Sequence, residues 1–154
     1  MTDQPKDLEK LENEWVYGPP GVGKSRGART RFPTLYNKGF SKWWDGYQGQ
    51  ETVLLDDLSP EHKWMSHHVK VWADHYPFTG EQKGSACLIR PKRIIVTSNY
   101  HPDDIWKDDP VLLTAIKRRF QIIHKMCALD QPILRPNPFA KPVDELDRKF
   151  QIIS

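Results

Sequence analysis

The stretch Gly18–Ser25 decides the fold. It reads GPPGVGKS and matches the phosphate-binding loop pattern G-x-x-x-x-G-K-[ST] at every fixed position. The three glycines of this stretch are expected to let backbone N–H groups point into one concavity, where phosphate oxygens lie near the positive end of the following helix. Lys24 is expected to reach the outer phosphates of a nucleoside triphosphate, and the Ser25 hydroxyl to join the shell of a Mg²⁺ ion. The expected nucleotide-binding residues are Gly18, Pro19, Pro20, Gly21, Val22, Gly23, Lys24 and Ser25.

Short apolar runs alternate with helix-like segments on both sides of this loop. Trp15–Tyr17 is β-prone and leads into the loop, and 25–31 is a helix-like segment that must stop before Pro33. Strands alternating with helices around such a loop predict a three-layer α/β domain, a P-loop NTPase fold with a mainly parallel central sheet. The further expected strands are 40–47, 52–55, 93–99 and 120–124, the further helices are 64–75 and 111–120, and 77–90 is expected as a hairpin or exposed loop that turns at Gly80 and Gly84.

The composition is typical of one globular, soluble domain. The chain has 154 residues, of which 38% are hydrophobic and 28% charged, and its formal net charge is +3. No apolar run approaches the roughly 20 residues that span a membrane, and no secretory signal opens the chain, so an intracellular protein with reduced cysteines is expected. We divide the chain into a polar helix or arm at 1–14, a globular domain at 15–126 and a Pro-rich tail at 127–154.

Two carboxylates follow the apolar run Thr52–Leu55. A phosphate-binding loop needs an acidic residue at the end of a neighbouring strand to hold Mg²⁺, and Asp56 and Asp57 occupy such a position. We assign Asp56 to the metal and Asp57 to the attacking water, because one carboxylate can hold the metal's water shell while the other polarises the nucleophile. The alternative is a solvated turn at a strand end.

Three further sets of residues are candidates with weaker signals. Asn99 ends an apolar strand, where its amide could hydrogen-bond the γ-phosphate or the attacking water, although such residues at strand ends usually form turns. Arg118 and Arg119 are either ordinary cations at a helix C-terminus or, as in ring ATPases, arginines that reach the γ-phosphate in a neighbouring subunit. Arg119 is preferred for this second role because it adjoins the next strand. Trp43 and Trp44 could stack on bases, although aromatic residues in such a run usually pack in the core.

The order of these segments resembles the superfamily 3 helicase domain of replication-initiator (Rep) proteins of small circular single-stranded DNA viruses, above all the circovirus and cyclovirus type. The segments that carry the resemblance are GPPGVGKS, KWWDGYQGQETVLLDDL, YPFTGEQKGS, IIVTSN and IKRRF, all within residues 15–126. The resemblance implies an AAA+-like ATPase that uses ATP and Mg²⁺. In it the first segment is the Walker A loop, Asp56 and Asp57 are the Walker B pair and Asn99 is the motif C asparagine.

The resemblance also implies what the chain acts on. Lys83, in the loop of YPFTGEQKGS, becomes the residue that contacts the DNA backbone in the pore of a hexameric ring, whereas without the resemblance it is simply a solvent-exposed lysine. ATP hydrolysis in such a ring drives translocation on single-stranded DNA and 3′–5′ unwinding during rolling-circle replication in the host nucleus. RNA is an open alternative as the track.

Other nucleotide-dependent functions also stay open. The loop would also begin a small-molecule kinase, but the sequence shows no arginine-rich substrate lid, and the paired aspartates favour water as the acceptor. A GTPase is disfavoured because no [NT]KxD motif occurs. We expect no DNA nicking by this chain, because it lacks the His-hydrophobe-His motif of the family's endonuclease, and without most of the family's ring-forming segment it could be a nucleotide-binding scaffold without turnover.

Overall fold

The computed structural model describes residues 4–126 of the 154-residue chain. Its centre is a five-stranded sheet in the order β2-β3-β6-β1-β7, in which every neighbouring pair is parallel. The strands are β1 (Glu14–Tyr17), β2 (Tyr36–Lys38), β3 (Thr52–Leu58), β6 (Arg93–Ser98) and β7 (Gln121–His124). The expected mainly parallel sheet is therefore confirmed. The Pro-rich tail expected at 127–154 lies outside the described residues.

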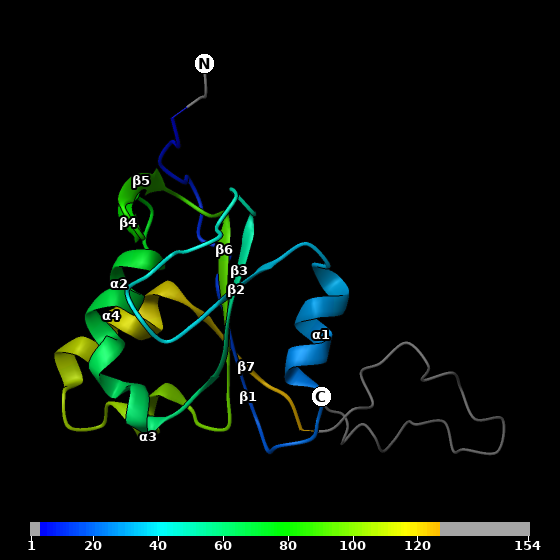
Figure 1. Ribbon diagram of the computed structural model, residues 1–154. Coiled ribbons are helices and arrows are strands. Elements are labelled where there is room, and N and C mark those ends of the chain that lie inside the picture. The colour runs from blue at the N-terminus through cyan, green and yellow to red at the C-terminus, as the bar shows by residue number, and fades with distance from the viewer. Residues whose placement is uncertain (1–3, 127–154) are drawn as a thin grey trace, which may run out of the picture.

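Helices cover both faces of this sheet and make three layers (Figure 1). One face carries α1 (Lys24–Arg31), whose Ala28 packs against Leu54 and Ile95 of the two strands β3 and β6. The opposite face carries the 3₁₀ helix η1 and the helices α2, α3 and α4, which span Pro60–Met65, Ser66–Trp72, Pro102–Ile105 and Pro110–Arg119. The three-layer α/β class predicted from the sequence is confirmed.

The strands β3 and β6 are buried by helices on both sides. A parallel strand in this position has no polar face, and accordingly Val53 is 1% exposed while Leu54 and Leu55 are fully buried. Each such side chain contributes about 1.5–3 kcal/mol on burial. This apolar centre fixes the carboxyl ends of the strands, where the candidate site residues lie.

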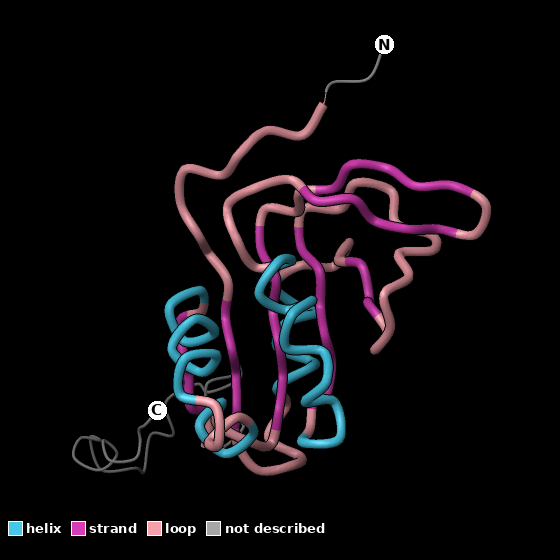
Figure 2. The backbone as a smooth tube through the Cα atoms, turned by 90° about the vertical axis from the view of Figure 1, so that its left-hand side faces the viewer, coloured by secondary structure: helices cyan, strands magenta, loops and turns pink. Residues whose placement is uncertain are grey.

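A second, antiparallel sheet of two strands forms the hairpin expected at 77–90. It consists of β4 (Phe78–Gln82) and β5 (Ser85–Ile89) and turns at Gly84, whose φ is 77°. Gly80 is not a turn point but lies within β4, where an added Cβ would come within 2.1 Å of Ile89 Cδ1. Figure 1 and Figure 2 show this hairpin beyond the amino ends of the central strands, at the opposite end of the sheet from the loop between β1 and α1.

The strand expected at 40–47 is wrong. The edge strand β2 comes earlier, and 39–51 is a loop that holds a single bridge at Trp43. Gly46 and Gly49 within this loop have φ values of 78° and 83°, which interrupt an extended run. Its aromatic content serves packing instead: Trp44 is fully buried in the core, whereas Trp43 is 41% exposed.

The amino-terminal segment is an arm rather than a helix in its described part. Residues 4–13 have no regular secondary structure, so the helical alternative for 1–14 is wrong there. The Leu8 N–H donates to the carbonyl of His75 at 2.8 Å, which ties the arm to the turn after α2. The helix expected at 64–75 starts earlier, as η1, and ends at Trp72. Among the described helices, none is long and apolar enough to cross a lipid bilayer.

Candidate nucleotide-binding site

The loop between β1 and α1 forms one wall of a cleft. Gly21 and Gly23 have φ values of 83° and 87°, a left-handed conformation that other residues rarely adopt. The cleft has a volume of ≈ 330 Å³ and is lined by Pro20, Gly21, Gly23, Lys24, Ser25, Arg26, Asp56, Asp57, Thr97 and Asn99. The structure thus brings most of the expected loop residues together with both expected carboxylates and the expected asparagine.

Gly18 serves the fold rather than phosphate recognition. Its N–H donates to the carbonyl of Ser98 at 3.1 Å, so this group does not point into the cleft as the sequence led us to expect. A Cβ at this position would lie 2.0 Å from the backbone oxygen of Lys125, so the segment after β7 requires glycine here. Pro19 and Val22 are likewise not among the residues that line the cleft, and Val22 is only 8% exposed.

Lys24 ties the loop to the end of β6. Its ammonium donates to the carbonyl oxygens of Gly18 and Pro19 at 2.9 and 2.8 Å, and to Asn99 Oδ1 at 3.1 Å. Burial lowers the pKa of this ammonium, and the two nearby aspartate carboxylates oppose the shift. A cation held in this way among oxygen atoms, next to backbone N–H donors, is suited to meet a polyphosphate.

Ser25 and Asp56 are placed to share a metal ion. Ser25 Oγ donates to Asp56 Oδ2 at 3.3 Å. Two oxygen ligands of one octahedral ion also lie close together, so this pair is suited to bind the same ion. Within residues 4–126, no group of three or more His, Cys, Asp and Glu side chains could form an all-protein metal site. Mg²⁺ keeps several waters and binds proteins through one or two oxygens plus substrate phosphates, so one hydroxyl and one carboxylate fit this ion.

A β-bulge turns both carboxylates toward the cleft. The pairing of β3 with β6 shifts its register between Leu55 and Leu58, where β3 holds one extra residue. Asp57, at this bulge, has a φ of 65°, the only positive value among the described residues other than glycine. In a regular strand, Asp56 and Asp57 would point to opposite faces of the sheet. The bulge therefore explains how two consecutive aspartates line one cleft.

Thr97 belongs to the polar end of the strand before Asn99, but the sequence pattern assigns a role only to Asn99. Its hydroxyl donates to Asp56 Oδ1 at 2.7 Å and accepts from the backbone N–H of Asp57 at 2.9 Å. Because Thr97 is only 2% exposed, this hydroxyl is fixed in place. The one sequence signal that could have revealed it is a hydroxyl residue two positions before Asn99, on the same strand.

Arg29 is a site residue that the sequence did not single out. Its Nε donates to Ser25 Oγ at 3.1 Å, and its Nη2 lies 3.9 Å from Asp56 Oδ2 and 3.1 Å from Asn37 Oδ1. Arg29 follows Ser25 by one helical turn of α1, so the two side chains share a face of the helix. This guanidinium is therefore placed to orient the Ser25 hydroxyl.

The strand that carries the carboxylates is not the direct neighbour of β1. The strand β6 lies between β1 and β3, so the acidic residues lie two strands away from β1 and the expected position on an adjacent strand is wrong. This order places Asn99, which directly follows β6, between the phosphate-binding loop and the carboxylates. An asparagine there can act on a bound phosphate from the middle of the cleft.

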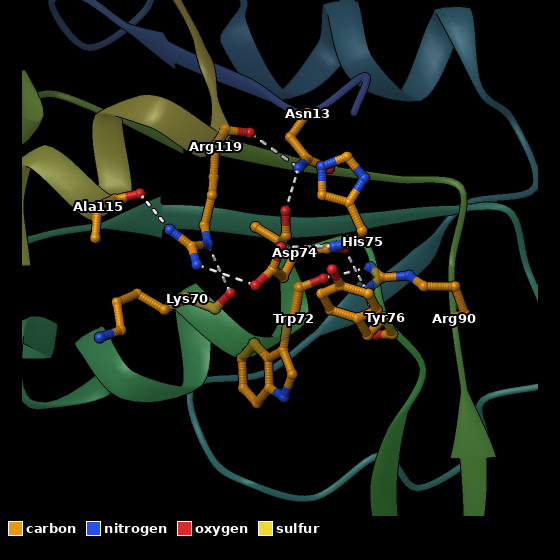
Figure 3. Close-up of polar contacts among 10 residues, drawn as sticks. Asn13, Lys70, Trp72, Asp74, His75, Tyr76, Arg90, Ala115 and Arg119 are labelled. Carbon is orange, nitrogen blue, oxygen red and sulfur yellow. Dashed lines mark hydrogen bonds and ion pairs between the residues drawn. The ribbon is translucent and has the colours of Figure 1, made fainter. Parts of the chain in front are cut away.

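The two arginines at the end of α4 differ in their contacts. Arg119 donates to the carbonyls of Lys70 at 3.2 Å and Ala115 at 2.8 Å and to the Asp74 carboxylate at 3.0 Å (Figure 3). Its side chain is 15% exposed and joins α4 to the end of α2. Arg118 is exposed and forms no ion pair with the described residues. The preference for Arg119 rests on its place in the sequence, whereas these contacts within the chain favour Arg118 as the arginine that is accessible to another molecule.

The end of α2 also anchors the hairpin. Arg90, which directly follows β5, donates to the carbonyls of Trp72, Asp74 and Tyr76 (Figure 3). Burial lowers the pKa of Arg90 to about 10, with Asp74 opposing the shift, so this guanidinium stays charged at neutral pH. The hairpin is therefore held firmly at its base.

Lys83 lies apart from the cleft, at the turn of this hairpin. It is exposed, and its backbone N–H donates to Asp45 Oδ1 at 3.0 Å. The structure therefore does not bring Lys83 together with the nucleotide-site residues, because the hairpin that carries it lies at the other end of the sheet (Figure 1).

Comparisons with known proteins give one family and several relatives. Residues 14–100 match the model of a family described as RNA helicase. The replication-associated protein of Beak and feather disease virus is 41% identical over 106 residues, which cover 68% of this chain and 35% of that protein. The protein of the same name from Goose circovirus is 40% identical over 147 residues, which cover 93% of this chain and 45% of that protein. That of Human associated cyclovirus 1 is 33% identical over 127 residues, which cover 77% and 44%, so the chain spans less than half the length of these relatives.

Proposed function

Because the chain belongs to the RNA helicase family, as the superfamily 3 helicase domain of a circovirus-like replication-associated protein, we propose that it is an ATP-hydrolysing motor that moves along single-stranded DNA. The observation that carries the proposal is the single cleft in which a phosphate-binding loop meets Asp56, Asp57 and Asn99. The names of the relatives support a place in viral DNA replication, and we assign it to rolling-circle replication in the host nucleus.

The loop and its two flanking residues hold the triphosphate in this proposal. Backbone N–H groups from Gly21 to Ser25 donate to phosphate oxygens at the positive end of α1. The Lys24 ammonium exchanges its present carbonyl contacts for oxygens of the outer phosphates. Ser25 Oγ and Asp56 hold Mg²⁺, which when bound neutralises charge on the phosphate oxygens.

Asp57 and Asn99 act on the nucleophile. Asp57 orients a water molecule and takes its proton as the water oxygen attacks the γ-phosphorus, while the bond to the bridging oxygen breaks and ADP leaves. The Asn99 amide, already 3.1 Å from the Lys24 ammonium, hydrogen-bonds the γ-phosphate or that water. Thr97 keeps both carboxylates in position through its two hydrogen bonds.

A neighbouring subunit completes the site. Charge that develops on the transferred phosphoryl group needs a further cation, because Lys24 contacts the phosphates in the ground state as well as in the transition state. The exposed Arg118 of an adjacent subunit supplies this cation in a ring, which we take to be a hexamer. Lys83, at the far end of the sheet, contacts the DNA backbone in the pore, and motion along the strand in the 3′–5′ direction separates the duplex.

The test is ATP hydrolysis per subunit measured against protein concentration, with and without single-stranded DNA. We expect turnover to rise with both and to vanish in Lys24→Ala, while Lys83→Ala keeps the basal rate and loses the stimulation by DNA. Turnover that changes neither with protein concentration nor with single-stranded DNA would contradict a ring motor and favour a P-loop kinase. Nucleotide binding without turnover would favour a scaffold. Stronger stimulation by RNA of the same sequence would indicate that the motor moves along RNA rather than DNA.

A further inference from the structure

The segment after β2 adds a third strand-like element to the hairpin. Trp43 forms a parallel bridge with Glu81 of β4, and the Trp44 N–H donates to the Glu81 carbonyl at 2.8 Å. Two residues further along, Asp45 Oδ1 accepts the N–H of Lys83 at 3.0 Å. Residues 43–45 therefore run alongside β4, on the edge opposite β5, and follow it up to the turn of the hairpin.

Side chains alternate between the two faces of this small sheet. Trp44 points into the core, where it is fully buried next to Trp72 and Phe78, so Trp43 points to the opposite face. Gly80 is the residue of β4 below Trp44, since an added Cβ would lie 3.3 Å from Trp44 Cδ1. We call the opposite, solvent-facing side the outer face; it carries Trp43, Thr79, Glu81, Ala86 and Leu88, and Lys83 ends it at the turn.

The outer face exposes an indole that its neighbours hold in place. Trp43 is 41% exposed and Leu88, on the adjoining strand, is 46% exposed. The Lys42 ammonium lies 4.9 Å from the centroid of the Trp43 ring and 3.2 Å from the Glu81 carboxylate. These contacts restrain the ring before any ligand arrives, which lowers the entropy that stacking would cost.

Of the two lysines beside this face, Lys42 forms an ion pair with another described residue and Lys83 does not. Lys42 and Glu81 balance one another, and two other surface lysines, Lys63 and Lys117, each pair with an aspartate elsewhere on the protein. The Lys83 ammonium, in contrast, has no carboxylate within ion-pair distance anywhere in residues 4–126. The Lys83 ammonium can therefore contact a phosphate directly, beside the Asp45 carboxylate that accepts the Lys83 backbone N–H, whereas the Trp43 region offers an aromatic surface without net charge.

We infer that Trp43 stacks on a base of the single-stranded nucleic acid whose backbone contacts Lys83. The two residues lie on neighbouring strand-like segments, and their positions differ by only two residues, or about 7 Å, along the strand. An aromatic side chain on a sheet face beside a cation is the arrangement that binds single strands regardless of sequence, because every base has a π-face. This inference rests on the proposed function and adds a contact to bases to that of Lys83 with phosphate.

The experiment measures the affinity of the full chain for a fluorescent oligothymidylate over a series of salt concentrations. Trp43→Ala is expected to weaken binding by about 5- to 100-fold, the range for loss of one stacked base, without changing the slope of log affinity against log salt. Lys83→Ala is expected to reduce that slope by about 0.7, the value for one lost phosphate contact on a single strand. Trp43→Phe should keep most of the affinity because it keeps a ring.

Trp64→Ala is the matched control, since Trp64 is 59% exposed on η1, away from the hairpin, and should leave binding unchanged. Unaltered affinity in Trp43→Ala would overturn the inference. A reduced salt slope in the same variant would also overturn it, because the tryptophan would then act only by positioning Lys83. If the wild-type chain itself fails to bind the oligonucleotide, both the proposed function and this inference are overturned, whereas a defect confined to the variants concerns the inference alone.

Discussion

The Thr97 hydroxyl bridges the two residues of the β3 bulge, since it donates to Asp56 Oδ1 at 2.7 Å and accepts the N–H of Asp57 at 2.9 Å. Thr97→Val keeps the shape of the side chain and removes both hydrogen bonds. We expect it to lower kcat for ATP hydrolysis by about 10- to 100-fold, because misplaced catalytic groups cost about that much, and to change nucleotide affinity little. Thr97→Ser should stay close to the wild type. Equal kcat values for the valine and serine variants would contradict a positioning role.

Asn99 lies 3.1 Å from the Lys24 ammonium, so both side chains address the same phosphate in the proposed site. Asn99→Ala is expected to lower kcat by about 100-fold, the cost of one lost donor to a developing charge, while a fluorescent ATP analogue still binds. Lys24→Ala should lose the binding as well, because it removes the cation of the loop. If Asn99→Ala loses nucleotide binding to the same degree as Lys24→Ala, the asparagine supports the loop rather than the chemistry.

Arg118 is expected to act across a subunit boundary. Arg118→Ala should lose ATP hydrolysis by about a thousand-fold, as for other arginines supplied in trans, with an unchanged melting temperature because the residue is exposed. Mixing Arg118→Ala with Lys24→Ala subunits should restore part of the activity, since some interfaces then combine one intact cleft with one intact arginine. No recovery in any ratio, in rings whose assembly is verified by light scattering, would argue against a contribution in trans.

Arg119 is expected to matter for stability instead. Arg119→Ala removes the bond to the Asp74 carboxylate and the bonds to two carbonyls, and it should lower the free energy of unfolding by about 2 kcal/mol, the order of a lost hydrogen bond to a charged group. Asp74→Asn is the matched variant, and urea unfolding measures both. An unfolding free energy equal to that of the wild type, together with lost hydrolysis, would favour Arg119 as the residue that reaches the neighbour.

The sequence predicted the parts of the site that lie in contiguous patterns. The stretch Gly18–Ser25, the pair Asp56–Asp57 and the end of the strand before Asn99 each appear as short local motifs, and the parallel sheet brings their ends to one edge. The bulge between Leu55 and Leu58 could not be predicted, because a register shift depends on the partner strand. For the same reason the sequence could not assign Thr97 its role, since that role exists only opposite the bulge.

The wrong predictions share a cause in long-range contacts. Gly18 resembles a phosphate-binding glycine, but glycine is required there because a Cβ would collide with the backbone of Lys125, far along the chain. The aromatic run 40–47 resembles a strand because burial and strand propensity favour the same residue types, and only the core shows that Trp44 packs while Trp43 does not. Arg119 looked free at a helix end, but its carboxylate partner, Asp74, lies in the turn that follows a different helix, α2.

The buried Lys38 gives stability a dependence on pH. It is 2% exposed, its ammonium donates to the carbonyls of Gly39 and Ser41, and it lies 4.8 Å from the centroid of the Trp72 ring. Burial lowers the pKa of Lys38 from 10.5 to about 8, with Asp45 opposing the shift. Between these values the unfolded chain holds the proton and the folded chain releases it, so the free energy of unfolding rises with pH across this window.

Lys38→Met removes the titrating group and keeps an apolar stem of similar length. From pH 7.5 to 9.5, we expect the wild type to gain about 2 kcal/mol in the free energy of unfolding relative to this variant, because a folded pKa below the unfolded one makes the unfolded state bind more protons. Other groups that titrate in this range cancel in the difference. Urea unfolding of both proteins at the two pH values measures it, and parallel pH profiles would show that Lys38 keeps its proton in the folded protein.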